Sequence, residues 1–306
     1  MSESGSKKAG STEDLRKTLG ELRDEIARAK TKERELSSLL DSIESEPRKV
    51  DERVDPKPIM EVESDPGRVS TGIPKFDDLV YGGLQPGTNL VLYGPPFSEK
   101  YIMAYNFIAK SLEEGVPIIV VTADKNIREI MYEVGKISEK INGSEQKGML
   151  RFIDVYSRSI QIESASRYAV TLDSPMNISA LMKAVDQIAA EIKQNHPFYR
   201  LLFSSLTTYV TLLEDRTFIR FTQQFSQKRK SENAVSLFLL EEGLFEKRVY
   251  EAISYLMDGA VEFRMGSTRN FLRVMGLGKA RSREWIDIYP EEHGFNLGSF
   301  SLEKVR

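Results

Sequence analysis

Apolar residues in the first part of the chain follow a heptad pattern. Between residues 13 and 45 they recur at alternating spacings of four and three, interrupted at Glu33: Leu15, Leu19, Leu22, Ile26, Ala29, Leu36, Leu40 and Ile43. A helix that packs on a globular domain usually has a wider apolar face than this stripe. The pattern therefore predicts a coiled coil over 13–45. Both a parallel homodimer and pairing with the helix of another protein fit it.

Two segments of different composition flank this predicted coiled coil. Residues 1–12 are rich in Ser, Gly and Lys, and we expect them to be disordered. Residues 46–66 contain four prolines, which fix φ and lack an N–H donor, so a helix cannot continue through them. We interpret 46–66 as a linker into a domain that starts at residue 67.

From residue 67 onward, short apolar runs alternate with longer amphipathic stretches. The runs predict strands at 89–93, 118–122, 150–155, from Leu201 onward, and at 234–240. The amphipathic stretches predict helices at 99–114, 126–140, 177–194 and 211–228. This alternation is typical of an α/β fold, in which helices cover both faces of a mostly parallel sheet.

The last third of the domain has a different pattern. Runs at 260–265, 270–277 and 285–289 predict antiparallel edge strands, and we interpret 289–306 as a C-terminal tail. The polar segment 157–174 is expected to be a surface loop.

An altered phosphate-binding loop follows the first predicted strand. The pattern for such a loop is G-x-x-x-x-G-K-[ST]. Its first glycine and its lysine are kept, whereas Glu99 replaces the second glycine and Tyr101 replaces the small hydroxyl residue that holds Mg²⁺. We interpret the whole loop as vestigial nucleotide-binding residues: Gly94, Pro95, Pro96, Phe97, Ser98, Glu99, Lys100 and Tyr101.

Both substitutions work against the binding of a nucleotide phosphate. The Glu99 carboxylate adds negative charge beside a site for a polyanion, and like charges about 4 Å apart repel by about 4 kcal/mol at an effective dielectric of about 20. The Tyr101 hydroxyl lies too far from its backbone to replace a serine or threonine. We expect the Glu99 carboxylate to enter the cradle of backbone N–H groups or to pair with Lys100, in place of a phosphate.

The segments around this loop resemble KaiC-like and RadA-like ATPases of the RecA superfamily. Residues 68–79 (RVSTGIPKFDDL) and 82–87 (GGLQPG) are similar to the family's entry segment. Residues 237–243 (LFLLEEG) and 256–262 (LMDGAVE) are similar to two of its later segments. The resemblance covers 67–288 and implies a RecA-like P-loop NTPase fold. The absence of cysteine and the coil-plus-ATPase layout resemble archaeal proteins.

The resemblance also locates two catalytic positions whose residues differ from the family's. An acidic pair after the second core strand polarises the attacking water in the family, and the matching residues here are Asp124 and Lys125. The Walker B aspartate supports Mg²⁺, and Ser204 stands in its position. We interpret all three as vestigial, and we expect neither a catalytic residue nor a metal site.

Lys279 and Arg281 match a third family feature. In the family, a similarly placed K-x-R pair reaches the γ-phosphate held by the neighbouring subunit. The resemblance therefore implies an inter-subunit contact, and the alternative is a solvated basic turn.

Composition excludes several classes of protein. The 306 residues have a formal net charge of −3, which argues against a nucleic-acid partner. The chain has no cysteine, so disulfides and Cys-ligated metals are excluded. No run approaches the about 18 apolar residues of a membrane span, and the N-terminus lacks the apolar core of a signal peptide. We expect a soluble, cytoplasmic protein.

These substitutions predict a non-catalytic pseudo-ATPase that regulates or scaffolds, in signalling or as the partner of an active paralogue. The coiled coil would recruit a protein partner, and the RecA-like domain would form homo- or hetero-oligomers with RecA-like subunits. We expect no cofactor, or else ATP or ADP bound without Mg²⁺. The alternatives are a nucleotide-binding sensor or weak ATPase, and a DNA-binding accessory protein related to recombinases.

Overall fold

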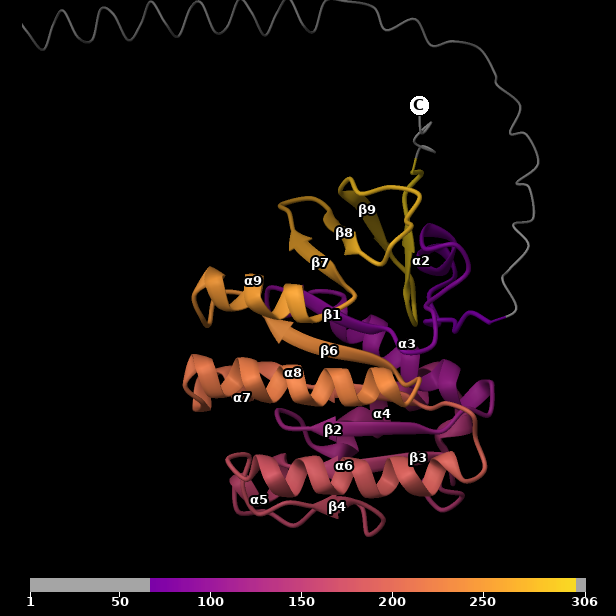
Figure 1. Ribbon diagram of the computed structural model, residues 1–306. Coiled ribbons are helices and arrows are strands. Elements are labelled where there is room, and N and C mark those ends of the chain that lie inside the picture. The colour runs from indigo at the N-terminus through magenta and orange to yellow at the C-terminus, as the bar shows by residue number, and fades with distance from the viewer. Residues whose placement is uncertain (1–66, 301–306) are drawn as a thin grey trace, which may run out of the picture. The chain divides into compact units, whose positions relative to one another are not determined.

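The computed structural model describes residues 67–300. The segments predicted as disordered, coiled coil and linker (1–12, 13–45 and 46–66) lie outside the described residues, as do residues 301–306. Within 67–300 the chain forms one ten-stranded sheet with helices on both faces (Figure 1). This confirms the predicted α/β fold.

The strands follow one another across the sheet in the order β10-β9-β8-β7-β1-β6-β5-β2-β3-β4. The neighbouring strands β7, β1, β6, β5, β2, β3 and β4 pair in parallel. Strands β8, β9 and β10 extend the sheet beyond β7 with antiparallel pairing. Their bounds are Asn89–Gly94 (β1), Ile118–Thr122 (β2), Leu150–Asp154 (β3), Val170–Thr171 (β4), Arg200–Ser204 (β5), Val235–Glu241 (β6), Gly259–Met265 (β7), Asn270–Gly276 (β8), Ile286–Pro290 (β9) and Phe295–Leu297 (β10). Because the central strands are parallel, their carboxyl ends meet at one edge of the sheet.

Two sets of helices cover the sheet. Helices α2 (Pro74–Leu79), α3 (Lys100–Glu113) and α4 (Ile127–Ile137) contribute to the core on one face. Helices α6 (Ile178–Lys193), α7 (Leu206–Leu212), α8 (Asp215–Ser231) and α9 (Lys247–Leu256) contribute to the core on the other, which is the near face in Figure 1. Along β1, Leu90 and Leu92 lie in the first core and Val91 in the second, as the alternation of a strand requires. Among the described residues, no helix has the length and apolar character to cross a membrane.

The structure contains helices that the sequence does not predict, namely α2, α9 and the short α5 (Tyr156–Ser159) at the start of the expected loop 157–174. The sequence predicts one helix over 211–228, but α7 and α8 are separate because Leu213 has an extended backbone, with φ −106° and ψ 150°. Helix α9 is not predicted from the sequence, since its buried stripe consists of Val249 and Ile253 only.

The edges of the sheet also extend further than predicted. Within the expected loop 157–174, Val170 and Thr171 form the short edge strand β4 on β3. Within the expected tail 289–306, β10 pairs with β9 on the opposite edge. Phe295 and Leu297 account for β10, because both side chains are buried in the core that α2 covers.

Candidate functional site

The altered phosphate-binding loop lies where the sequence predicts it, between a buried strand and a helix. Strand β1 ends at Gly94, and α3 begins at Lys100. A glycine is required at position 94 because a Cβ there would lie 2.8 Å from the Cβ of Phe263. Glu99 is the residue before the helix, and its side chain makes no capping hydrogen bond to the backbone. The strand–loop–helix geometry is therefore kept, and the differences from a nucleotide site lie in its side chains.

The side chain of Lys100 is fully buried and paired with groups of its own chain. Its ammonium lies 2.8 Å from a carboxylate oxygen of Glu241, at the end of β6. It also donates hydrogen bonds to the carbonyl oxygens of Pro95, at 2.5 Å, and Gly94, at 3.2 Å, and to the hydroxyl of Ser98. Burial lowers the pKa of Lys100, and the carboxylate of Glu241 opposes that shift. The charge that would meet a phosphate is thus compensated inside the protein.

Tyr101 connects two partly buried carboxyl groups beside this lysine. Its hydroxyl donates a hydrogen bond to Glu241 at 2.6 Å and lies 3.2 Å from Asp124. The Lys125 ammonium lies 4.5 Å from the centre of the Tyr101 ring. Burial raises the pKa of the tyrosine hydroxyl, and the neighbouring carboxylates raise it further. Tyr101 thus remains a neutral hydrogen-bond donor to these carboxyl groups.

Asp124 and Ser204 meet at the ends of adjacent strands. Strands β2 and β5 pair in parallel, and the Ser204 hydroxyl donates to a carboxylate oxygen of Asp124 at 2.7 Å. Burial raises the pKa of Asp124, and this hydrogen bond and the charge of Lys125 oppose the shift. The structure therefore brings Lys100, Tyr101, Asp124 and Ser204 into one network at the carboxyl edge of the parallel sheet.

The sequence predicts Glu99 as the internal anion of this network, but the carboxylate that pairs with the lysine is that of Glu241. Glu99 turns away from the lysine, and one of its carboxylate oxygens accepts a hydrogen bond from the Asn270 side chain at 2.7 Å. Its other oxygen is buried and has no hydrogen-bond partner among the described residues. Sequence reasoning missed both Glu241 and Asn270. The available signal for Glu241 was its place directly after the apolar run of β6, a strand that neighbours β1.

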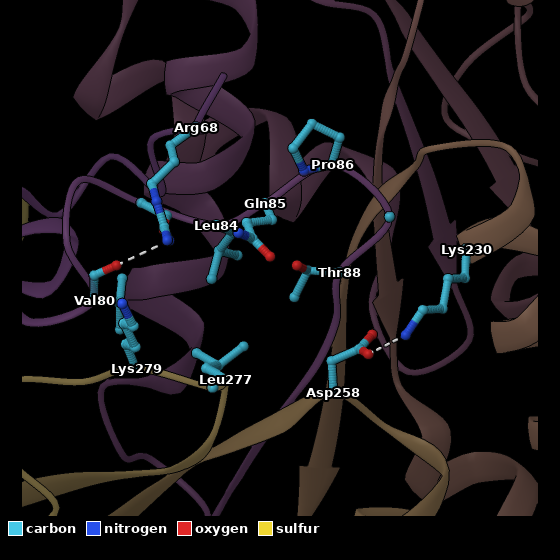
Figure 2. A pocket seen from close by; sticks show the side chains of 13 residues that line it. Arg68, Val80, Leu84, Gln85, Pro86, Thr88, Lys230, Asp258, Leu277 and Lys279 are labelled. Atoms are coloured by element: carbon cyan, nitrogen blue, oxygen red, sulfur yellow. Dashed lines mark hydrogen bonds and ion pairs between the residues drawn. The ribbon is translucent and has the colours of Figure 1, made fainter. Parts of the chain in front are cut away.

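Lys279 and Arg281 occupy different surroundings. Lys279 lines a pocket of about 510 Å³, in which Arg68 donates to the carbonyl oxygen of Val80 and Lys230 pairs with Asp258 (Figure 2). The Arg281 guanidinium instead donates to the carbonyl oxygen of Asp78 at 2.6 Å and lies over the ring of Tyr81. This pocket adjoins Thr88, at the start of β1, so six strand residues, or about 20 Å, separate it from the phosphate loop.

Comparison with known proteins agrees with this architecture. Residues 69–297, most of the chain, match the KaiC ATPase family. The chain belongs to this family. The KaiC-like protein PH0186 of Pyrococcus horikoshii has a similar solved structure, with a TM-score of 0.59, 19% identity, and coverage of 76% of this chain and 99% of that one. At this identity the likeness shows the fold.

Curated relatives of this KaiC-family chain belong to the UPF0273 proteins. The UPF0273 protein of Aeropyrum pernix is 28% identical over 127 residues, which are 40% of this chain and 51% of that protein. The UPF0273 protein of Thermotoga maritima is 28% identical over 149 residues, 47% of this chain and 58% of that protein. The chain thus spans about half the length of the curated relatives it matches.

Mg·ATP, the ligand implied by an ATPase family, does not fit the side chains of this site. The loop lysine is paired with Glu241, and the two positions that support Mg²⁺ hold Tyr101 and Ser204, whose hydroxyls bond to carboxyl groups. A triphosphate would also enter beside the carboxyl groups of Glu99 and Asp124. Between residues 67 and 300, no group of three His, Asp or Glu side chains is arranged to hold a metal ion.

Proposed function

We propose that this KaiC-family protein is a non-catalytic pseudo-ATPase that acts as a regulatory or scaffolding subunit. In this role it takes part in signalling or assembles with itself or with an active paralogue. The observation that carries the proposal is the 2.8 Å ion pair between the loop lysine and Glu241. The carboxylate occupies the partner position that a phosphate takes in an active phosphate loop.

Electrostatics supports this reading of the ion pair. A nucleotide phosphate would have to displace Glu241 from Lys100 and then lie beside a carboxylate that has lost its cation. Two like charges about 4 Å apart repel by about 4 kcal/mol at an effective dielectric of about 20. This repulsion is as large as the attraction between Lys100 and a phosphate at the same distance. Each further carboxylate near the phosphate adds to the repulsion.

The surface of the loop supports a protein partner at the same edge of the sheet. The Phe97 side chain is 93% exposed, and its φ of 65° lies in a region that few non-glycine residues adopt. Backbone strain of this kind clusters at functional sites. Leu244, which follows β6 at this carboxyl edge, is 57% exposed. The predicted coiled coil would supply a second contact, from outside the described residues.

Calorimetric titration of ATP and ADP into the full chain, with and without Mg²⁺, tests the proposal. The expected result is no binding heat at about millimolar nucleotide, a concentration that corresponds to about −4 kcal/mol of binding free energy. Steady ATP turnover that the Lys100→Ala variant loses would contradict the proposal.

A restored site sharpens this test. The combined substitutions Glu99→Gly, Tyr101→Thr, Ser204→Asp and Glu241→Gln remove the internal anion and return the hydroxyl and carboxylate that support Mg²⁺. We expect this variant to gain Mg²⁺-dependent ATP binding. Its matched control adds Lys100→Ala, which should abolish the gained binding. Equal affinities in the wild type and the restored variant would show that the internal pairing does not block the site.

A nucleotide-binding sensor is the second candidate, and the retention of Lys100 in the first turn of α3 favours it. In such a sensor a phosphate would exchange with Glu241 for the lysine and release the carboxylate. Micromolar ATP binding that is indifferent to Mg²⁺, without turnover and with a change in oligomer size, would favour this candidate over the scaffold.

A further inference from the structure

The antiparallel end of the sheet has one face that no helix of residues 67–300 covers. On the near face in Figure 1, α9 lies against β7, where the Tyr250 hydroxyl donates to Glu262. Beyond it, β8 and β9 continue the same face, and none of the helices that the structure describes lies in front of them. The opposite face of these strands is the apolar one, with Leu272, Val274 and Ile286 in the core.

Cross-strand register places arginines and aromatic rings together on the uncovered face. Arg264 pairs in register with Phe271, and Glu262 with Arg273. Trp285 immediately precedes β9 and is half-buried. Tyr289, four residues further along, lies on the same face and is 45% exposed. We call this surface, formed by Arg264, Phe271, Arg273, Trp285 and Tyr289, the arginine face. The same register places two carboxylates on it, Glu262 opposite Arg273 and Asp287 opposite Phe271.

The guanidinium groups on the arginine face lie over its rings. The Arg264 guanidinium carbon is 4.4 Å from the centre of the Trp285 ring and 5.0 Å from that of Phe271. The Arg273 guanidinium carbon is 4.6 Å from the centre of the Trp285 ring. Within residues 67–300, no carboxylate forms an ion pair with Arg264, whereas Arg273 pairs with Glu262 at 2.5 Å. A planar guanidinium stacked on a ring still has N–H groups at its edge that can donate to phosphate oxygens.

The segment between Glu262 and Glu284 is basic, although the whole chain is acidic. From residue 263 to residue 283 there is no Asp or Glu, and the segment contains six cations: Arg264, Arg269, Arg273, Lys279, Arg281 and Arg283. The net charge of −3 averages this segment with the rest of the chain. Lys279 lines the pocket near Thr88, and Arg281 and Arg283 donate to backbone carbonyl oxygens, so three of these cations, Arg264, Arg269 and Arg273, lie beside the uncovered face. Together with the two carboxylates of Glu262 and Asp287 they leave a local charge of +1, opposite in sign to that of the whole chain.

We propose that the arginine face binds single-stranded nucleic acid. The arginines contact backbone phosphates, and unpaired bases replace their guanidinium groups on the rings of Trp285 and Phe271 and stack on the exposed ring of Tyr289. Sheet faces with exposed aromatic rings and basic side chains recognise single strands in this way, because every unpaired base has a ring face to stack. A duplex or an acidic peptide would satisfy the arginines but would leave the rings without a stacking partner.

Trp285 makes the proposal directly measurable, since it is the only tryptophan of the chain. The experiment titrates an oligothymidine of about 16 nucleotides into the full chain and follows both tryptophan emission and the anisotropy of a labelled strand. We expect the strand to quench the Trp285 emission. We expect its affinity to fall roughly 10- to 20-fold between about 50 and 200 mM salt, as three phosphate contacts require.

Two substitutions identify the surface. Arg264→Gln and Trp285→Ala should each weaken binding at least about fivefold, whereas Trp285→Phe, which keeps a ring, should retain most of the affinity measured by anisotropy. Arg269→Gln is a second charge variant on the same end of the sheet. The matched control is Arg248→Gln on α9, which removes an equal charge from a side chain that is 70% exposed.

Three results would overturn the proposal. The first is the absence of both quenching and an anisotropy change at low salt. The second is equal binding by the Arg264→Gln and Arg248→Gln variants. The third is equal, Arg264-dependent binding of a duplex of the same length or of vesicles with anionic lipid, because the surface would then recognise negative charge without unpaired bases.

Discussion

Lys100 at the phosphate-loop edge and Arg264 on the arginine face are cations in opposite states. At the phosphate-loop edge, formed by the loop 94–101 with Asp124, Ser204 and Glu241, the ammonium of Lys100 is buried and paired with a carboxylate. On the arginine face, the guanidinium of Arg264 is exposed and stacked on aromatic rings. An ion pair compensates the charge of a cation, whereas stacking on a ring leaves the N–H groups of a guanidinium free to donate hydrogen bonds.

This difference shows that the position of a cation in a family fold does not by itself decide its role. Lys100 stands where a phosphate-binding lysine is expected, yet its partners are a carboxylate and two carbonyl oxygens of the same chain. Such a lysine acts as a structural group, because removal of one member of a buried pair leaves the other uncompensated. We therefore expect substitutions at the two regions to have different consequences for stability.

The largest expected effect is that of Lys100→Ala on the free energy of unfolding. The substitution leaves Glu241 without its cation, so we expect a loss of about 3–5 kcal/mol. Arg264→Gln, which removes an exposed cation, should cost less than about 1 kcal/mol. Urea unfolding of both variants measures the contrast. Losses of similar size would show that the two cations do not differ as described.

A double substitution separates the pair from its surroundings. If the loss arises from the uncompensated carboxylate, Lys100→Met combined with Glu241→Met should restore most of the stability, because apolar residues of similar volume can replace a buried ion pair. A double variant as unstable as Lys100→Ala would indicate that the lysine is needed for the loop carbonyl oxygens instead.

A smaller loss is expected from Tyr101→Phe. The substitution keeps the ring but removes the hydroxyl that bonds to Glu241 and lies near Asp124. Hydrogen bonds to charged groups contribute about 1.5–3 kcal/mol, and we expect a loss in this range by urea unfolding. Tyr255→Phe is the control, because that side chain is 87% exposed. Equal stabilities of the two variants would contradict the network.

Asn270→Ala tests the contact between the phosphate loop and β8, the strand that carries Phe271 and Arg273, since β8 begins at Asn270 and its side chain bonds to Glu99 of the loop. The other oxygen of that carboxylate has no hydrogen-bond partner among the described residues. The substitution should therefore cost about 1–3 kcal/mol. Glu99→Gln in the same background should recover part of the loss, because a neutral amide is cheaper to bury than a carboxylate. No recovery would mean that Asn270 acts through β8 alone.

The sequence predicted the sheet well because its strands and helices have strong local patterns. All five residues of β2 are buried, and the apolar stripe of α6 identifies that helix. The loop 94–101 was also located from local order, by a strand before it and a helix after it. Elements with weak local patterns, such as the two-residue β4 and the helix α9, could not be predicted in this way.

The partners within the site could not be predicted, because they come from distant parts of the chain. Tyr101 and Glu241 are 140 positions apart, and Glu99 and Asn270 are 171 apart. Reasoning from neighbouring residues placed Glu99 in the cradle of backbone N–H groups or paired it with Lys100, but the parallel pairing of β1 with β6 brings Glu241 to the lysine instead. The basic segment 263–283 was visible in the sequence, and the net charge of the whole chain obscured it.

The smallest expected effect concerns the pH dependence of stability, which should involve the phosphate-loop edge. Burial raises the pKa of Tyr101 above its usual value of 10.0. As the pH rises above about 10, the unfolded state loses this proton while the folded state keeps it, so stability falls by up to about 1.4 kcal/mol per pH unit. The lowered pKa of Lys100 acts in the opposite direction, but mainly below about pH 10.5, where the unfolded lysine still binds a proton.

Above that pH, the unfolded lysine also loses its proton, so its opposition to the tyrosine contribution decreases. Urea unfolding between about pH 10.5 and 11.5 should show a slope that Tyr101→Phe reduces by nearly one proton. Tyr255→Phe and Arg264→Gln should leave the slope unchanged, because both side chains are exposed. If Tyr101→Phe and Tyr255→Phe have equal slopes, the Tyr101 hydroxyl is accessible to solvent. The phosphate-loop edge would then be an open site, and its contrast with the arginine face would disappear.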